Sequence, residues 1–102
     1  MILEHAILNV RAGEAEAFLE AFAQASPIIE SQRGCRSLRL ERCVEDPDKF
    51  LLLVEWGTLE DHTEGFRRSP EYQRWRELLH KFYDPFPVVE HFTTAHSTTA
   101  PS

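Results

Sequence analysis

His62 is the residue of this sequence whose type and position are best suited to acid–base chemistry. It follows Leu59 by three residues and precedes Phe66 by four, at the edge of an apolar helical stripe. An imidazole has an unperturbed pKa of about 6.5, so a half-buried histidine can act as a base near neutral pH. The alternative is a structural histidine that bonds to the backbone or packs on Trp56.

Two polar residues near the N-terminus are further candidates. His5 and Asn9 share one face of a predicted strand over residues 2–9 with Leu3 and Ile7, because alternate strand residues point the same way. Buried polar groups need hydrogen-bond partners. Both side chains could therefore line a pocket beneath the helices, or they could lie in an interface between two copies. Alternation alone leaves both faces open.

Aromatic side chains at helical spacing supply the walls that such chemistry would need. Side chains in this pattern usually form a core. The tyrosine hydroxyl and the indole nitrogens still require polar partners, which suits a cavity for a flat aromatic or enolic ligand. The set comprises Trp56, Phe66, Tyr72, Trp75 and Phe82.

Charge and motif content argue against several functional classes. A formal net charge of −6 is wrong for nucleic-acid binding, which needs clustered Lys and Arg. No GxGxxG, Walker, HExxH, GxSxG or CxxC pattern occurs in the sequence, so no cofactor or metal is expected.

The compartment expected from the sequence is the cytoplasm. No apolar run approaches the ~20 residues that cross a bilayer, and the N-terminus lacks the basic and apolar regions of a signal peptide. Cys35 and Cys43 would lie at opposite ends of one strand, too far apart for a disulfide, and free thiols suit a reducing compartment.

The elements that position these side chains follow the order β-α-β-β-α-α-β. Helical periodicity begins at residue 14, and Pro27 is expected to kink or restart the first helix with Ser26 as its cap. Thr58 and Asp61 resemble a capping box in front of His62. Residues 94–102 are expected to form a disordered tail. The strands are predicted over 2–9, 35–43, 50–56 and 87–92, and the helices over 14–31, from 58 to 66 and from 70 to 82.

This order predicts an α+β ferredoxin-like domain over residues 1–93. Right-handed crossovers place all helices on one face of a four-stranded antiparallel sheet, with the first and third strands in the centre. Both central strands are apolar on both faces, so the helix-free face would expose a large apolar patch. A homodimer through that face is predicted, with His91 of the last, edge strand in the contact. The alternative is a monomer that tolerates the patch.

Together these features resemble the antibiotic biosynthesis monooxygenase (ABM) domain family of the dimeric α+β barrel superfamily. The resemblance runs from Ile2 to Thr93. It implies the ferredoxin-like fold, a homodimer built sheet to sheet, and a pocket between sheet and helices. The residues that carry it are Glu55-Trp56, Leu59, His62, Phe66, Ser69-Pro70, Tyr72, Trp75 and Pro87-Val88-Val89-Glu90-His91.

The resemblance also implies a chemistry. Members of the family include oxygenases of polyketide quinone precursors that use no metal or flavin. Loss of a proton from a phenol or enol gives an anion that can reduce O₂, so the protein needs a base, a polar anchor and a dry pocket. For this chain the resemblance suggests His62 as the base, with Asn9 or Tyr72 as the anchor. The remaining substrate-binding candidates are His5, Trp56, Phe66 and Trp75.

The superfamily offers two alternatives to this activity. Haem-degrading relatives use an Asn on the first strand and a Trp and a His on the helices, and Arg76 stands nearest to that histidine. Haem cleavage is therefore not expected. The main alternative is a non-catalytic small-molecule-binding or stress-response dimeric barrel protein. A cavity in which His62 and another polar group converge would favour the enzyme.

Overall fold

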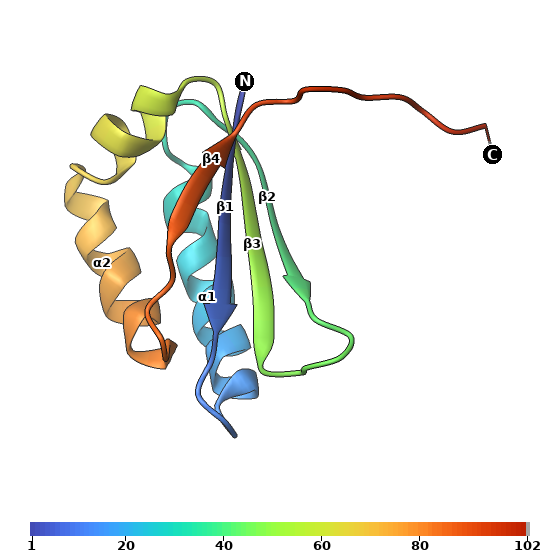
Figure 1. Cartoon of the computed structure of the whole chain (residues 1–102). Helices are drawn as coiled ribbons and strands as arrows, with labels where there is room; N and C mark the ends of the chain where they lie inside the picture. The colour runs from blue at the N-terminus through green and yellow to red at the C-terminus, as the bar shows by residue number, and fades with distance from the viewer. Residues whose placement is uncertain (102) are drawn as a thin grey trace.

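The chain folds as a four-stranded sheet with two helices packed on it. The computed structural model describes residues 1–101, so Ser102 of the predicted tail lies outside the described residues. Residues 94–101 form neither helix nor strand and run away from the sheet (Figure 1). The elements are β1 (Ile2–Asn9), α1 (Ala15–Glu30), β2 (Cys35–Arg42), β3 (Lys49–Trp56), the π-helical turn η1 (Asp61–Phe66), α2 (Pro70–Leu79), the 3₁₀ turn η2 (His80–Phe82) and β4 (Val89–Phe92).

The sheet has the predicted ferredoxin-like topology. Its strands are antiparallel and follow the order β2-β3-β1-β4, so β1 and β3 are central (Figure 1). In this register Glu4 of β1 lies opposite Val54 of β3 and His91 of β4. Paired residues of antiparallel strands point to the same face. Glu4 and His91 therefore share one side of the sheet.

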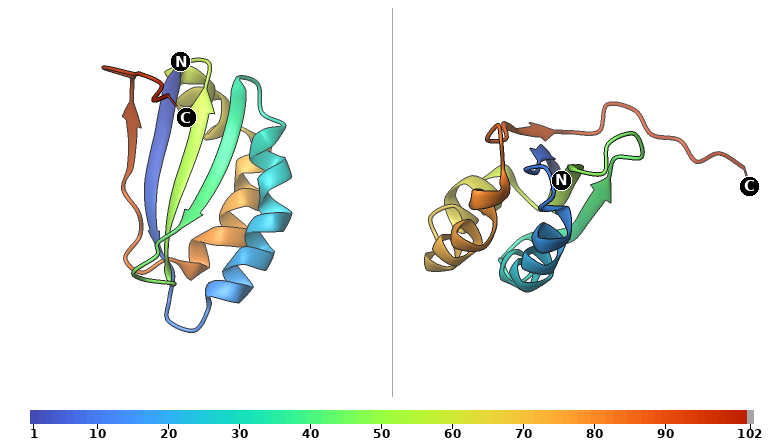
Figure 2. Two further views of the ribbon diagram at one scale, coloured as in Figure 1. Left: turned by 90° about the vertical axis from the view of Figure 1, so that its right-hand side faces the viewer. Right: turned by 90° about the horizontal axis from the view of Figure 1, so that it is seen from below.

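Both helices cover one face of the sheet and leave the other bare (Figure 2). Along each central strand, alternate residues point to the covered face and to the free face. The free face carries half-buried or exposed residues, among them Leu3, His5, Ile7, Asn9, Leu51 and Leu53. The covered face carries buried residues, namely Glu4, Ala6 and Leu8 of β1 and Phe50, Leu52, Val54 and Trp56 of β3.

Helix α1 supplies the predicted apolar stripe to the core. Phe18 and Ile29 are fully buried, and the Phe18 ring lies 5.1 Å from the Phe50 ring. Of the kink or restart predicted at Pro27, the restart is wrong, because α1 runs continuously from Ala15 to Glu30 and Ser26 lies inside it. The donor that proline lacks falls close to the helix end, where burial of Ile29 against the sheet holds the last turn in place.

The segment that carries His62 is a single π-helical turn and not the regular helix that the spacing predicts. The Arg67 amide donates to the His62 carbonyl at 3.0 Å, a five-residue bond. The expected capping box is present, since Thr58 N donates to Asp61 Oδ2 and Asp61 N donates to Thr58 Oγ1, each at 3.1 Å. The turn buries both His62 and Phe66 against the sheet.

A glycine fixes where this turn sits relative to β2. Gly34 has a φ of +84°, in the left-handed region that favours glycine. Its Cα lies so close to the Asp61 side chain that a Cβ would overlap the carboxylate. Gly34 therefore permits both the tight turn into β2 and the close approach of the capping residue.

No helix within residues 1–101 is long and apolar enough to cross a membrane.

Candidate functional site

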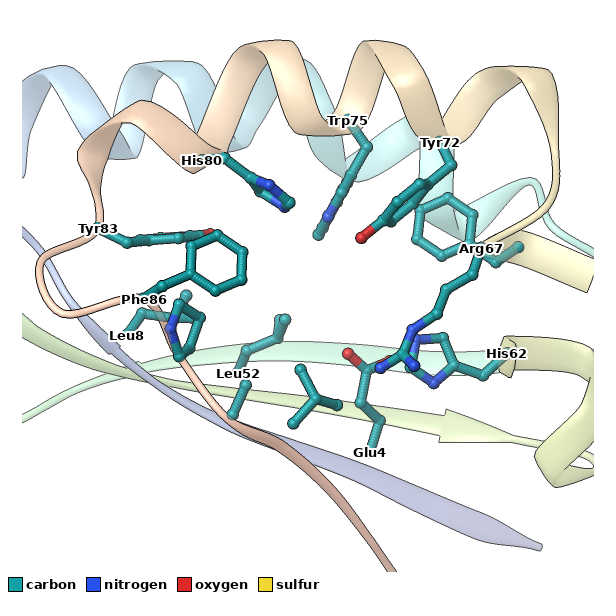
Figure 3. A pocket seen from close by; sticks show the side chains of 14 residues that line it. Glu4, Leu8, Leu52, His62, Arg67, Tyr72, Trp75, His80, Tyr83 and Phe86 are labelled. Atoms are coloured by element: carbon teal, nitrogen blue, oxygen red, sulfur yellow. The ribbon is translucent and has the colours of Figure 1, made fainter. Parts of the chain in front are cut away.

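A cavity of about 360 Å³ lies between α2 and the covered face of the sheet (Figure 3). Strand residues form its floor, and α2 contributes Tyr72 and Trp75 from above. Polar and charged groups gather at one end, and aromatic side chains close the other. The lining residues are Glu4, Ala6, Leu8, Leu52, His62, Phe66, Arg67, Tyr72, Trp75, His80, Tyr83, Phe86, Pro87 and Val89.

The polar end contains a chain of close polar contacts. Glu4 and His62 are only 4% and 3% exposed. Glu4 Oε1 accepts from Trp56 Nε1 at 2.9 Å and lies 3.3 Å from His62 Nε2. On the other side of the imidazole, His62 Nδ1 lies 2.8 Å from His91 Nε2. The order of contacts is thus His91, His62, Glu4, Trp56.

The two nitrogens of the imidazole face different partners. His62 Nε2 lies within ion-pair distance of Glu4 Oε1, and an ionised Glu4 can only accept a hydrogen bond. With a hydrogen on Nε2, the His62 Nδ1 accepts from His91 Nε2. The His62 ring stacks on Trp56 at 5.2 Å with an interplanar angle of 14°. His62 therefore packs on Trp56, as the structural alternative for this residue predicted.

Burial shifts the two acid–base groups in opposite directions. It lowers the pKa of His62 to about 3, and the positive charges of Arg67 and His91 act in the same direction. Burial raises the pKa of the Glu4 carboxyl, while the Trp56 hydrogen bond and Arg67 oppose that rise. The 3.3 Å contact has the geometry of an ion pair. The lowered pKa of His62 makes it a contact between a neutral imidazole and the Glu4 carboxyl group.

Arg67 adds a permanent positive charge to this end of the cavity. Its side chain points toward Glu4 and His62 (Figure 3). At the opposite end, burial lowers the pKa of His80, with Arg76 as a second cause, and raises the pKa of the Tyr83 hydroxyl. These groups place a carboxylate, a guanidinium and several aromatic faces around one small volume.

Four of the seven predicted site residues line this cavity. His62, Phe66, Tyr72 and Trp75 lie around it. Trp56 is fully buried behind Glu4 and is not part of the lining. It supports the carboxylate through its indole nitrogen and leaves the wall to other aromatic residues.

Of the two positions left open for His5 and Asn9, the structure shows the free face and not the pocket beneath the helices. Both lie on the free face, beside a separate hollow that also contacts Lys49 and Glu90. The alternation in β1 turns the neighbouring residue Glu4 inward.

His91 does not face the side of the sheet that was predicted to form the dimer contact. Its ring is on the covered face and hydrogen-bonds to His62, because His91 pairs with Glu4 across the sheet.

Sequence reasoning missed several residues of the site. The signal for Glu4 was present, since a lone acid shares a strand face with Ile2, Ala6 and Leu8. Such an acid in a central strand needs a buried partner. No comparable pattern marks Arg67, which belongs to the connection between η1 and α2. The other missed residues are His80, Tyr83 and His91.

The chain resembles known proteins in both sequence and structure. The model of the antibiotic biosynthesis monooxygenase family matches residues 1–78. The protein YczJ of Bacillus subtilis (strain 168) is 55% identical over 92 residues, covering 90% of this chain and 97% of its own length. A crystal structure from Bordetella bronchiseptica, named for the same family, is 34% identical with a TM-score of 0.88, covering 93% of this chain and 97% of its own.

A more distant structure shares the fold. SnoaB of Streptomyces nogalater, described as a cofactor-independent oxygenase, is 14% identical with a TM-score of 0.82 and covers 94% of each chain. At this identity the likeness concerns the backbone arrangement alone.

Proposed function

Because this chain belongs to the antibiotic biosynthesis monooxygenase family, we propose that it is a monooxygenase that uses neither metal nor flavin and acts on a small aromatic or enolic molecule. One observation carries the proposal. A buried carboxylate–imidazole pair, Glu4 and His62, borders an aromatic-walled cavity of about 360 Å³. A base in a poorly hydrated pocket is what deprotonation of a phenol or enol requires.

In this proposal the Glu4–His62 pair accepts a proton from the substrate, and the proton ends on Glu4. Both nitrogens of His62 are engaged, and its pKa of about 3 makes it a weak base. The carboxylate has a raised pKa and is a stronger base than usual, and its Oε2 forms no hydrogen bond within residues 1–101. His62, predicted from the sequence as the base, then holds Oε1 in place through Nε2–H.

The substrate supplies the electrons for the oxygen step. An anthrone illustrates the balance: its methylene carbon loses two hydrogens, gains one oxygen atom of O₂ as a carbonyl, and the second oxygen atom leaves as water. The protein's part is to remove the first proton and to keep water from the anion. Phe66 and Trp75 provide apolar walls, and Tyr72 offers a hydroxyl as a polar anchor.

We also propose that the protein is a homodimer, the typical state in this family, and that the free face of its sheet forms the contact. Ile7 and Phe92 on that face are 40% and 45% exposed. Burial of this apolar surface by a second copy would stabilise the pair. The proposed compartment is the cytoplasm, which is supported by the free thiols of Cys35 and Cys43.

Oxygen consumption with a panel of anthrones and hydroquinones tests the enzymatic proposal. Wild type is expected to take up O₂ with at least one of them. His62→Ala and Glu4→Gln are expected to lower the rate by roughly 10²-fold or more, the usual contribution of an acid–base group. His96→Ala, in the extended tail, is the matched control and should keep the wild-type rate.

Two results would reject the mechanism. One is no uptake by wild type with any compound of the panel, and the other is equal uptake by folded His62→Ala. Ligand binding without oxygen uptake would instead favour the non-catalytic small-molecule-binding protein. Circular dichroism of each variant separates loss of the base from loss of the fold.

A further inference from the structure

Arg67 is a cavity charge without a protein partner. Its backbone is tied to the π-turn by the bond to the His62 carbonyl. Among residues 1–101 its guanidinium forms no hydrogen bond or ion pair, whereas its neighbour Arg68 pairs with Glu64 at 2.8 Å. Figure 3 shows the Arg67 side chain directed at Glu4 and His62. A guanidinium held beside a carboxylate, but not bonded to it, leaves a position between the two for a ligand oxygen.

We propose that this position selects an aromatic or enolic ligand that enters neutral with an ionisable hydroxyl, and that it excludes aromatic carboxylates. The hydroxyl oxygen would lie between Glu4 and Arg67. This inference rests on the proposed function, because it takes the same cavity as the substrate site. Within the aromatic or enolic class already proposed, it adds a selection by charge, which it assigns to Arg67 and Glu4.

The preference for a neutral hydroxyl follows from the charge balance of the cavity. With Glu4 ionised, the carboxylate and the Arg67 guanidinium sum to zero. A hydroxyl that enters transfers its proton to Glu4 Oε2, and the O–H bond electrons stay on the ligand oxygen. The negative charge then moves from Glu4 to the ligand and remains near Arg67, so no unpaired charge arises at any stage.

The charge of a ligand carboxylate cannot be balanced in this way. It enters already negative and has no proton to transfer at neutral pH. Its oxygens would lie beside the Glu4 carboxylate, which is 4% exposed and poorly hydrated. Two like charges in such a place repel strongly, and one Arg67 cannot neutralise both.

The remaining walls set the shape of the ligand. Phe66 is 1% exposed and Trp75 is 6% exposed, and both turn aromatic surface toward the cavity from above the sheet. Leu8 and Leu52 close the floor. A volume of about 360 Å³ is at the small end of ligand pockets, which span roughly 300–1,000 Å³. The ligand is therefore a compact ring system with its hydroxyl at the polar end.

Binding of three matched probes tests the inference without turnover. They are 4-nitrophenol, 4-nitroanisole and 4-nitrobenzoate, which differ only in the group that meets Glu4 and Arg67. Titration calorimetry with wild type is expected to show 4-nitrophenol binding about tenfold or more tightly than either of the others, since one lost charged hydrogen bond is worth about that much. The bound 4-nitrophenol should ionise at lower pH than the free compound, followed by its phenolate absorbance.

Three variants sharpen this test. Arg67→Gln should weaken 4-nitrophenol about tenfold and abolish the shift in its ionisation, because the cation beside the oxyanion is gone. Arg68→Gln is the matched control, since Arg68 pairs with Glu64, and it should bind like wild type. Glu4→Gln should bind 4-nitrobenzoate about tenfold more tightly than wild type does, because the repelling charge is removed.

Three outcomes would overturn the inference. They are absence of 4-nitrophenol binding, equal binding of 4-nitrobenzoate and 4-nitrophenol by wild type, and equal behaviour of Arg67→Gln and Arg68→Gln. Oxygen plays no part in these measurements. A protein that binds 4-nitrophenol as expected but takes up no O₂ would keep the ligand class and lose the proposed oxygenase.

Discussion

The two faces of the sheet carry polar residues in opposite ways. On the covered face, Glu4 and His62 are buried, lie 3.3 Å apart and line one cavity. On the free face, His5 and Asn9 lie among half-exposed apolar residues. Both faces come from the same strands, and in β1 they differ by one residue of alternation.

This difference distinguishes a face suited to the proposed reaction from a face suited to contact with a second copy. A buried carboxylate must be held by specific donors, and Trp56 Nε1 and His62 Nε2 provide them. Exposed leucine, isoleucine and phenylalanine side chains have no such requirement and are stabilised by any well-fitting apolar cover. We therefore assign the proposed reaction to the covered face and the proposed dimer contact to the free face.

The largest contrast is expected from adjacent truncations in β3. Phe50 is 1% exposed and packs on Phe18, while Leu51 faces the free side. Phe50→Ala should lower the free energy of unfolding by about 3–5 kcal/mol, and Leu51→Ala by about 1 kcal/mol. Urea unfolding at equal protein concentration measures both. Equal losses would show that the two faces are not buried differently.

A charge on the free face should act on assembly. Leu53→Asp puts a carboxylate in the middle of that face, where a partner copy would bury it. We expect the dimer dissociation constant to rise at least a hundredfold, about 2.7 kcal/mol, as followed by sedimentation. Gln73→Asp, on the exposed side of α2, is the control and should leave the dimer intact. A wild-type monomer at micromolar concentration would contradict the dimer.

Acid should destabilise the covered face through His62. The pKa of His62 is about 3 in the folded chain and 6.5 without the fold, so the unfolded chain binds the proton first as the pH falls. Its contribution to stability is complete above pH 6.5 and is lost on the way to pH 3. Between pH 6.5 and about pH 5 the loss from His62 alone should be about 1–2 kcal/mol.

Glu4 works against this trend. The raised pKa of its carboxyl means that the folded chain binds that proton more readily, so acid relieves the cost of burying the charge. His62→Gln should therefore flatten or invert the loss measured by urea unfolding, and His96→Gln should not change it. If His62→Gln and wild type lose the same free energy, the neutral buried imidazole is refuted.

The smallest effect is expected at the start of the π-turn. Thr58→Ala removes the hydroxyl that accepts from the Asp61 amide, which should lower the free energy of unfolding by about 1 kcal/mol. Thermal unfolding measures the change against Thr98→Ala in the tail, which should unfold like wild type. No difference between the two variants would mean that the capping box does not stabilise the turn.

The sequence predicted the scaffold because the scaffold depends on local patterns. Apolar residues on both faces identified the central strands, and the spacing of Phe18, Phe22 and Ile29 identified the face of α1. The capping box of Thr58 and Asp61 was also readable, since both partners lie three residues apart.

The site was less predictable because its partners are distant in the chain. Both faces of β1 carry the apolar residues that marked it as a central strand, but each also carries polar ones, so alternation could not decide that Glu4 points inward and His5 outward. Glu4 is buried only because donors from β3 and η1 meet it after folding. The spacing of Leu59, His62 and Phe66 fits an ordinary helix, so it could not indicate the π-turn that orients the imidazole.

Nitrogen-15 NMR of the histidine side chains tests the division between the two faces most directly. His62 and His91 report on the covered face, and His5 reports on the free face. On addition of 4-nitrophenol we predict that the imidazole signals of His62 and His91 shift while those of His5 stay unchanged. A shift of His5 with unchanged His62 and His91 would place the ligand on the wrong face and contradict the account.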